Sequence, residues 1–233
     1  VRGLEYAVAR RDVVLAPGAK PPVKLRLTRW VNMARRGWHS ADAHIHANYV
    51  ANHHQVITPE DVRLQTQAED LNLANLMVAN SYTAYIHDEQ YFEGRPHRLS
   101  TPRHILYWNE EMRGGTHFGH MCFFNLKSLV KPYFTGPAIG VDWEDYPANA
   151  TQARQAMEQG GAVTYAHPGY LSPLDQFNAR ELPVDLALGA VDAMDILSNS
   201  FETAGETIYH RLLNCGFRLT ASAGTDSFTN LTD

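Results

Sequence analysis

Four apolar segments of this chain each end in a histidine or a carboxylate, and this pattern constrains the fold more than any other feature. The segments end at His46, Glu111, His167 and Asp226. Parallel strands joined by helices place their carboxyl ends at one edge of the sheet, where β/α barrels collect their active-site groups. We therefore expect an α/β protein whose strands, about seven in number, form a closed or nearly closed β/α barrel. An open doubly wound sheet is the alternative.

From residue 40 onward, apolar segments of strand length alternate with helical segments. Thr58 is suited to cap a helix that runs to about residue 70, because Pro59 can take the first helical position and Glu60 and Asp61 place acids in the first turn. Residues 81–102 are polar and aromatic and are expected to form a long loop over a site. The other expected elements are strands over 42–46, 73–78, 104–108, 118–126, 162–166, 191–197 and 217–223, and helices over 149–159 and 202–214.

Residues 1–38 differ from the rest and are expected to be the C-terminal strands of a small β-sandwich-like module. Segments 5–10 and 23–30 alternate apolar with polar residues, and a turn rich in Pro and Gly separates them. Residues 39–233 are expected to be the barrel, with its C-terminal part incomplete. Because the chain begins with Val1, we expect a piece of a longer protein. It is periplasmic or secreted if an upstream signal peptide was removed, and cytoplasmic otherwise.

The composition argues against several classes of function. With 44% hydrophobic residues among 233, the chain has enough apolar side chains for a sizeable core. A net charge of −5 without a cluster of Lys or Arg argues against a nucleic-acid partner. No apolar segment approaches the roughly 18 residues of a membrane span. Two cysteines provide neither a disulfide framework nor a cysteine zinc site. A small-molecule substrate is the expected partner, and the oligomeric state does not follow from the sequence.

His44 and His46 are the strongest individual sign of a metal site. Residues two apart on a strand point to the same side, so the two imidazoles should converge while Ala43 and Ile45 face apolar packing. Neutral imidazole is a good ligand for Zn, Fe, Mn and Ni. The chain has 12 histidines, where about five are expected at this length.

Further candidate ligands lie at other strand ends. A single His or Asp there most often caps a helix or bonds a loop, but several polar groups buried together need something to organise them, and a metal does so. Glu110 and Glu111 are adjacent and point to opposite faces, so only one can enter the site, and the residues alone leave open which. With Glu111 in that place, the candidate ligands are His44, His46, Glu111, His120, His167 and Asp226.

Six ligands exceed the three or so protein ligands of a mononuclear catalytic zinc. Two divalent ions fit better, with Glu111 and a hydroxide as bridges, and Zn, Mn, Fe, Co and Ni all suit this set. Such a pair lowers the pKa of a bridging water and favours an anionic transition state. Asp226 is then both a ligand and a proton acceptor. His54, His87 and His117 are candidates to polarise the substrate.

Four motifs follow one another along the chain: Asp42-Ala43-His44-Ile45-His46, Asn109-Glu110-Glu111 with Gly119-His120, Ala166-His167-Pro168, and Ala223-Gly224-Thr225-Asp226-Ser227. Over roughly residues 30–230 this series resembles the PHP-like metallohydrolases. Within them it resembles most the CehA/McbA group, whose named members hydrolyse aryl N-methylcarbamates. The resemblance implies a distorted (β/α)7 PHP-like barrel with a metal cluster at its C-terminal mouth. It also implies the six ligands above, with Glu111 rather than Glu110 as the acid.

One departure from that family lies after the second strand, where typical PHP domains carry Asp-His and this chain has Ala79-Asn80-Ser81. Asn80 is a poor substitute for an anionic ligand, so we expect at most two metal ions and a weaker case for phosphoesterase activity. The expected function is that of an enzyme, a metal-dependent hydrolase that uses a metal-bound hydroxide to cleave a carbamate, ester or amide bond.

Two alternatives stay open. A PHP-type phosphoesterase would act at the same site and would need Arg or Lys near the mouth. A degenerate barrel that binds ligand without catalysis predicts missing metal ligands. The arginines in suitable loops are Arg95, Arg98, Arg103 and Arg113. The aromatic residues that can wall an aryl leaving group are Tyr82, Tyr85, Tyr91, Phe92 and Trp108.

Overall fold

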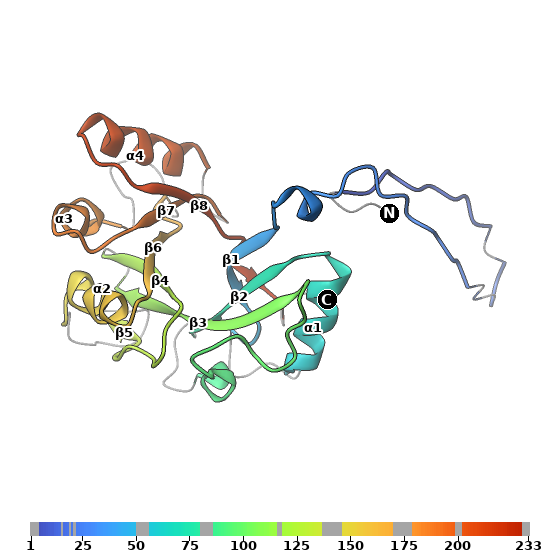
Figure 1. The fold of residues 1–233 in the computed structure, drawn as a ribbon, viewed down its shortest axis with the longest axis horizontal. Helices are drawn as coiled ribbons and strands as arrows, with labels where there is room; N and C mark the ends of the chain where they lie inside the picture. Colours follow the sequence, from blue (N-terminus) through green and yellow to red (C-terminus); the bar gives the residue numbers. More distant parts are fainter. Residues whose placement is uncertain are drawn as a thin grey trace.

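The computed structural model describes residues 5–14, 16–18, 20, 22–49, 56–79, 86–115, 118–136, 146–169, 179–198 and 202–229. These residues form a curved nine-stranded sheet flanked by helices, and the N-terminal residues extend away from it (Figure 1). None of the helices formed by these residues has the length and apolar character needed to cross a membrane.

The strands are β1 Ala41–His46, β2 Leu73–Val78, β3 Ile105–Gly114, β4 Gly119–Phe124, β5 Phe134–Thr135, β6 Ala162–Ala166, β7 Ala193–Leu197, β8 Thr220–Ala223 and β9 Ser227–Phe228. Their order in the sheet is β8-β7-β6-β4-β3-β2-β1-β9, and β5 pairs with β3. β4 runs antiparallel to both of its neighbours, and the other pairs are parallel.

The helices are α1 Pro59–Ala68, α2 Asn149–Glu158, α3 Leu182–Ala187 and α4 Glu202–Asn214, with short 3-10 helices η1 Ala34–Arg36 and η2 His87–Tyr91. In Figure 1, α2, α3 and α4 follow one another along the left side and α1 lies on the right. The predicted start of α1 is confirmed, because Thr58 and Asp61 form a reciprocal capping box and Pro59 follows the cap.

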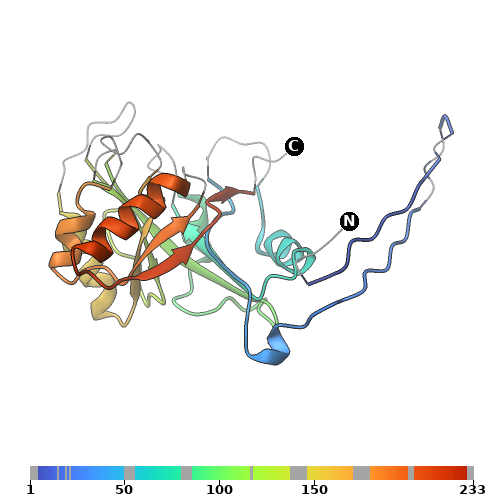
Figure 2. The same cartoon turned by 90° about the horizontal axis from the view of Figure 1, so that it is seen from above.

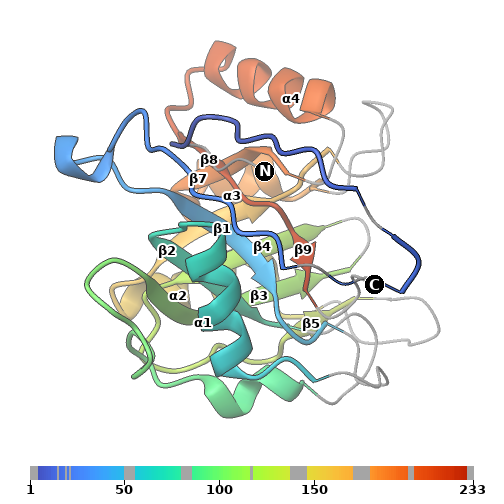
Figure 3. The same cartoon turned by 90° about the vertical axis from the view of Figure 1, so that its right-hand side faces the viewer.

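The segment that connects β8 to β9 brings the last strand onto the first. The backbone N–H of Asp226 donates to the carbonyl of His44 at 2.8 Å, and that of Thr229 donates to His46 at 2.9 Å. Figure 3 shows this segment in red, running from β8 to β9. The result is a mixed α/β half-barrel. It agrees with the expected distorted barrel, while the count of seven β/α units stays a prediction.

The antiparallel direction of β4 differs from the expected parallel sheet. β3 ends at Gly114 and β4 begins at Gly119, and a link of this length is too short for the helical crossover that a parallel pair requires. β3 is also longer than the expected strand over 104–108, because its second half pairs with β4 and β5. The first residues of β4 therefore lie at the same edge as the last residues of its neighbours.

The N-terminal segments pair only locally. Tyr6 and Arg29 form one antiparallel bridge, with Ala7 N–H donating to Thr28 and Trp30 N–H donating to Glu5. Among the described residues of this region no longer strand forms, and the two extended segments project from the body of the protein (Figure 2). Arg29 also contacts Asp70 beyond α1 at 2.5 Å. The proposed origin of this region in a β-sandwich-like module stays a prediction.

The apolar core has two main parts. Phe123, Tyr165 and Met194 belong to a cluster between the sheet and α2, α3 and α4. Leu76 and Trp108 belong to a second cluster that includes residues of α1 and β1. Trp108, which the sequence suggested as a wall for an aryl leaving group, is fully buried in that core.

Gly224 tests the contact between the β8–β9 segment and β1. A Cβ atom at this position would lie 2.5 Å from the Cβ of His44 and 2.9 Å from its backbone nitrogen. We expect Gly224→Ala to lower the free energy of unfolding by about 1–3 kcal/mol, because the two backbones must separate. Gly115→Ala is the control, since its added Cβ meets nothing nearer than 3.4 Å. Denaturant unfolding measures both, and equal stabilities would contradict this contact.

Asp88 should make stability depend on pH. Burial raises its pKa from 3.8 to about 6, although Asn48 donates a 2.7 Å hydrogen bond to it. The folded state therefore holds the proton more tightly than the unfolded state, so the free energy of unfolding falls as pH rises from about 4 to about 6 and then levels off. Relative to Asp88→Asn, the wild type should lose about 2–3 kcal/mol over this range. Urea titrations at several pH values measure this, and a constant difference would refute it.

Candidate metal centre

The six predicted ligands lie together inside the half-barrel, near the edge formed by the carboxyl ends of the parallel strands. They come from different elements, which explains why no single motif reveals the site. The contributions are His44 and His46 from β1, Glu111 from β3, His120 from β4, His167 after β6, and Asp226 between β8 and β9.

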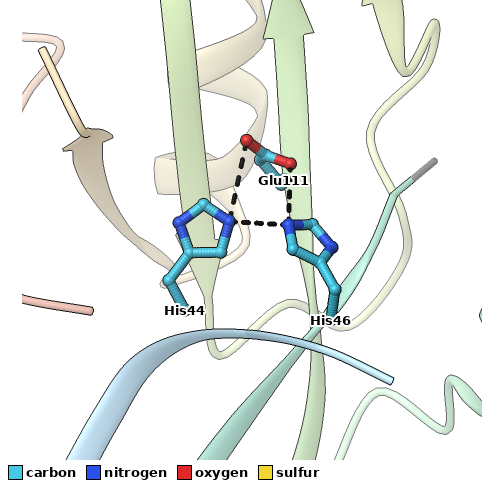
Figure 4. Close-up of side chains that lie close together, drawn as sticks. All are labelled: His44, His46 and Glu111. Atoms are coloured by element: carbon cyan, nitrogen blue, oxygen red, sulfur yellow. Dashed lines mark hydrogen bonds and ion pairs between the residues drawn. The ribbon is translucent and has the colours of Figure 1, made fainter. Parts of the chain in front are cut away.

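His44 and His46 face each other from one strand, as alternation predicted. Their Nε2 atoms are 2.9 Å apart, and both nitrogens point toward Glu111 (Figure 4). The Nε2 atoms also lie 3.3 and 3.0 Å from one carboxylate oxygen of Asp226. Two imidazoles and two carboxylates thus surround one small space.

Glu111 links this pair to the rest of the cluster. Its Oε1 atom lies 2.9 Å from His120 Nδ1, 3.5 Å from His167 Nε2 and 3.6 Å from His44 Nε2. Its Oε2 atom lies 3.4 Å from His46 Nε2 and accepts no hydrogen bond within the described part of the chain. A carboxylate in this central position can be shared between two groups of ligands.

Glu110 lies on the other side of β3, so the two adjacent acids have opposite environments. Its carboxylate accepts a 2.7 Å hydrogen bond from the backbone of Val130, and burial raises its pKa to about 8. For Glu111, burial opposes ionisation, but His44, His120 and Arg113 hold its pKa well below the usual value. Of the two adjacent acids, the ionised one is therefore Glu111.

Backbone geometry aims two of the side chains. His167 and Asp226 have φ values of 31° and 49°, in the left-handed region that residues other than glycine rarely adopt. Asp42 fixes the approach to Asp226, because its carboxylate accepts hydrogen bonds from the N–H and hydroxyl of Thr225 at 2.9 and 2.6 Å. Strain of this kind persists where the surrounding structure enforces it, often at functional sites.

The donor set fits a divalent transition metal. Burial lowers the pKa of His46, and burial together with the charge of Arg113 lowers that of His120 to about 4. The imidazoles of His46 and His120 are therefore neutral and can offer a lone pair, as metal binding requires. His44 differs, because burial lowers its pKa but Cys122 and Glu111 raise it well above the ordinary value, so a metal bound there would displace a proton. Among the described residues, the six candidate ligands form three overlapping groups of three, and the ligand atoms of each group lie within 4.8 Å of one another. His44, Glu111 and His167 each belong to two of these groups. Imidazole and carboxylate together suit Zn, Mn, Fe, Co or Ni.

Two inward-facing residues were not predicted from the sequence. Cys122 Sγ lies 3.6 Å from His44 Nδ1, and burial raises the pKa of its thiol to about 12. Asp195 is buried on β7 and accepts a 2.6 Å hydrogen bond from Ser222. For Cys122 the available signal was its position two residues after His120 on the same strand. For Asp195 the available signal was a different one, namely an acidic residue inside an apolar strand.

Not all residues predicted from the sequence belong to the part of the chain that the structure describes. His54 and His117 lie outside the described residues, as do Asn80, Tyr82 and Tyr85. His87 lies in η2, where its Nε2 atom is 3.3 Å from the hydroxyl oxygen of Tyr91.

The candidate arginines have different surroundings. Arg95 and Arg103 have exposed side chains that pair with Glu93 and Asp70. Arg98 is also exposed. Arg113 differs, because its Nε atom lies 3.9 Å from Glu111 Oε2.

A cavity of about 820 Å³ lies away from the cluster, on the outer side of β1. It is lined by α1, β1 and the β8–β9 segment, including Val62, Ile45 and Phe228. None of the six candidate ligands lines this cavity, so the cavity is not part of the candidate metal centre.

Comparison with known proteins supports the fold. No family model matches this chain. No curated protein matches it either. Among solved structures, it is similar to a two-domain protein from Bacteroides vulgatus described as containing a predicted PHP-like metal-dependent phosphoesterase, with a TM-score of 0.50 and 14% identity. The match covers 81% of this chain and 51% of that one, so this chain spans about half of its length. At this identity the likeness shows a shared fold.

Proposed function

We propose that this chain is a metal-dependent hydrolase whose six clustered side chains hold one or two divalent transition-metal ions. The observation that carries the proposal is the convergence of four imidazoles and two carboxylates on one buried space. Burial of so many polar groups is unfavourable unless they are paired or bind a metal. A degenerate barrel without catalysis would be expected to lack part of this set.

In this proposal His44, His46 and Asp226 would hold one ion and His120 and His167 the other, and Glu111 lies close enough to both groups to contribute to either. Bound there, two divalent ions would supply a water of lowered pKa as nucleophile and polarise the bond under attack. Asp226 stays the candidate proton acceptor, and its carboxylate is ionised, because the neighbouring histidines outweigh the opposing effect of burial and lower its pKa. His54 and His117 stay candidates for polarising the substrate.

The first candidate substrates carry a carbamate, ester or amide bond, as the sequence motifs shared with the CehA/McbA group suggest. A second candidate is a phosphoester. The position of Arg113 beside Glu111 favours it, because guanidinium groups bind phosphate oxygens in a two-pronged manner. The solved structure with this fold is itself described as containing a predicted phosphoesterase.

Removal of the histidine pair tests the metal site. We expect the His44→Ala/His46→Ala double variant to lose bound metal and to lower hydrolysis by more than roughly 100-fold, since even outer partners of metal ligands contribute 10- to 100-fold. Elemental analysis measures the metal. A panel of p-nitrophenyl acetate, an aryl N-methylcarbamate and p-nitrophenyl phosphate measures the activity. His210→Ala, at an exposed position on α4, is the control. Full metal content and rate in the double variant would refute the proposal.

The two adjacent acids provide a matched comparison. We expect Glu111→Gln to lose metal and activity, because an amide cannot supply the shared negative charge. Glu110→Gln should keep both, since Glu110 faces the core and is largely protonated at neutral pH. The same elemental analysis and substrate panel compare the two variants. Loss of metal in Glu110→Gln alone would reverse the assignment of the ligand.

A further inference from the structure

Arg113 occupies the position on β3 that follows Glu111 on the same face of the strand. Alternate residues of a strand share a face, so its side chain extends from the cluster toward the edge of the sheet. Exposure of the side chains increases in that direction, from 1% for Glu111 to 12% for Arg113 and 15% for His120. Arg113 and His120 are opposite each other on β3 and β4. Together they form the accessible side of the cluster.

Neighbouring residues fix the backbone of Arg113, and the Tyr49 ring contacts its guanidinium group. The backbone N–H of Arg113 donates to Tyr133 at 2.9 Å, and the residue pairs with Phe134 of β5. Its Cζ atom lies 5.4 Å from the centroid of the Tyr49 ring. The Tyr49 ring in turn packs against Phe228, with centroids 4.3 Å apart. Contact with a ring uses the flat face of a guanidinium and leaves the in-plane N–H groups for hydrogen bonds.

The charge of this region favours an anion. Two divalent ions would more than balance the two carboxylates of the cluster, and Arg113 adds a further positive charge beside them. Arg95 and Arg103 cannot replace it, because they are exposed and pair with acids elsewhere. A positively charged and partly desolvated group attracts an anionic ligand more strongly than an exposed one.

We propose that Arg113 is a specificity-determining residue that binds an anionic oxygen of the substrate next to the bond that is cleaved. The anionic oxygen belongs either to a phosphoryl group or to a carboxylate of the substrate. This inference rests on the proposed hydrolase function, since it assigns Arg113 to the same site. A purely structural role, in which Arg113 only orients Glu111, is the competing explanation.

Anion binding by the metal-loaded protein tests the inference without turnover. Calorimetric titration with inorganic phosphate and with malonate should show binding by the wild type. We expect roughly 10- to 100-fold weaker binding by Arg113→Gln, the loss typical of one charge-assisted interaction. Arg113→Lys keeps a positive charge beside Glu111 and thereby protects metal loading, but it lacks the planar fork, so its binding should also weaken. Arg95→Gln is the matched control and should bind as the wild type does.

The two ligands distinguish the source of the anionic oxygen. Loss of phosphate binding alone indicates a phosphoryl group, and loss of malonate binding alone indicates a substrate carboxylate. Wild-type affinity for both anions in either metal-loaded variant of Arg113 would overturn the proposal. Failure of the hydrolase proposal would appear separately, as absence of turnover in a wild type that still binds anions through Arg113.

Kinetics separate recognition from structural support. Where the enzyme turns over, Arg113→Gln should lower kcat/KM for p-nitrophenyl phosphate by a larger factor than it lowers kcat/KM for the neutral p-nitrophenyl acetate. An equal loss on both substrates would mean that Arg113 only supports Glu111, and the proposal would be wrong.

Discussion

The direct contact between the β8–β9 segment and β1 is the constraint on which the rest of the structure depends. The N–H of Asp226 bonds to the carbonyl of His44, so a carboxylate from the end of the chain is fixed beside a histidine from its beginning. Gly224 permits this approach, because no Cβ fits against His44. Thr225 adds two hydrogen bonds to Asp42. A sheet that stayed open at this point would separate Asp226 from the histidine pair, and the cluster would lose one of its six candidate ligands.

Local patterns predict a large part of this arrangement. The strands over 73–78 and 162–166 and the helix over 202–214 have the bounds expected from periodicity and turn residues alone. The direction of β4 could not be predicted in this way, because an apolar period of two is the same in either direction and only the short link after Gly114 distinguishes them. Cys122 alternates with His120 and Asp195 is an acid inside an apolar strand, but neither signal shows that the side chain lies near the cluster, because that depends on the neighbouring strands.

The contrast between Glu110 and Glu111 shows how one strand creates two chemical environments. Both side chains are buried, yet burial raises the pKa of Glu110 to about 8, whereas histidines and Arg113 hold that of Glu111 well below its usual value. A protonated acid on the core side needs few partners, and Val130 supplies one. An ionised acid on the inner side needs positive charge. The cluster therefore favours a bound cation near Glu111, because its histidines are only partly charged.

The accessible side of the cluster is supported from outside the sheet. Asn149 at the start of α2 donates to the carbonyl of Gly119 at 3.2 Å and to the hydroxyl of Tyr165 at 3.0 Å, which in turn donates to Asp185 at 2.5 Å. These bonds fix the start of β4, and β5 fixes the end of β3, so His120 and Arg113 face each other on rigid strands. The six candidate ligands lie on or just after strands that the half-barrel brings together, whereas Arg113 depends on the extension of β3 past Glu111. Substrate preference can therefore change at residue 113 without any change in the ligands.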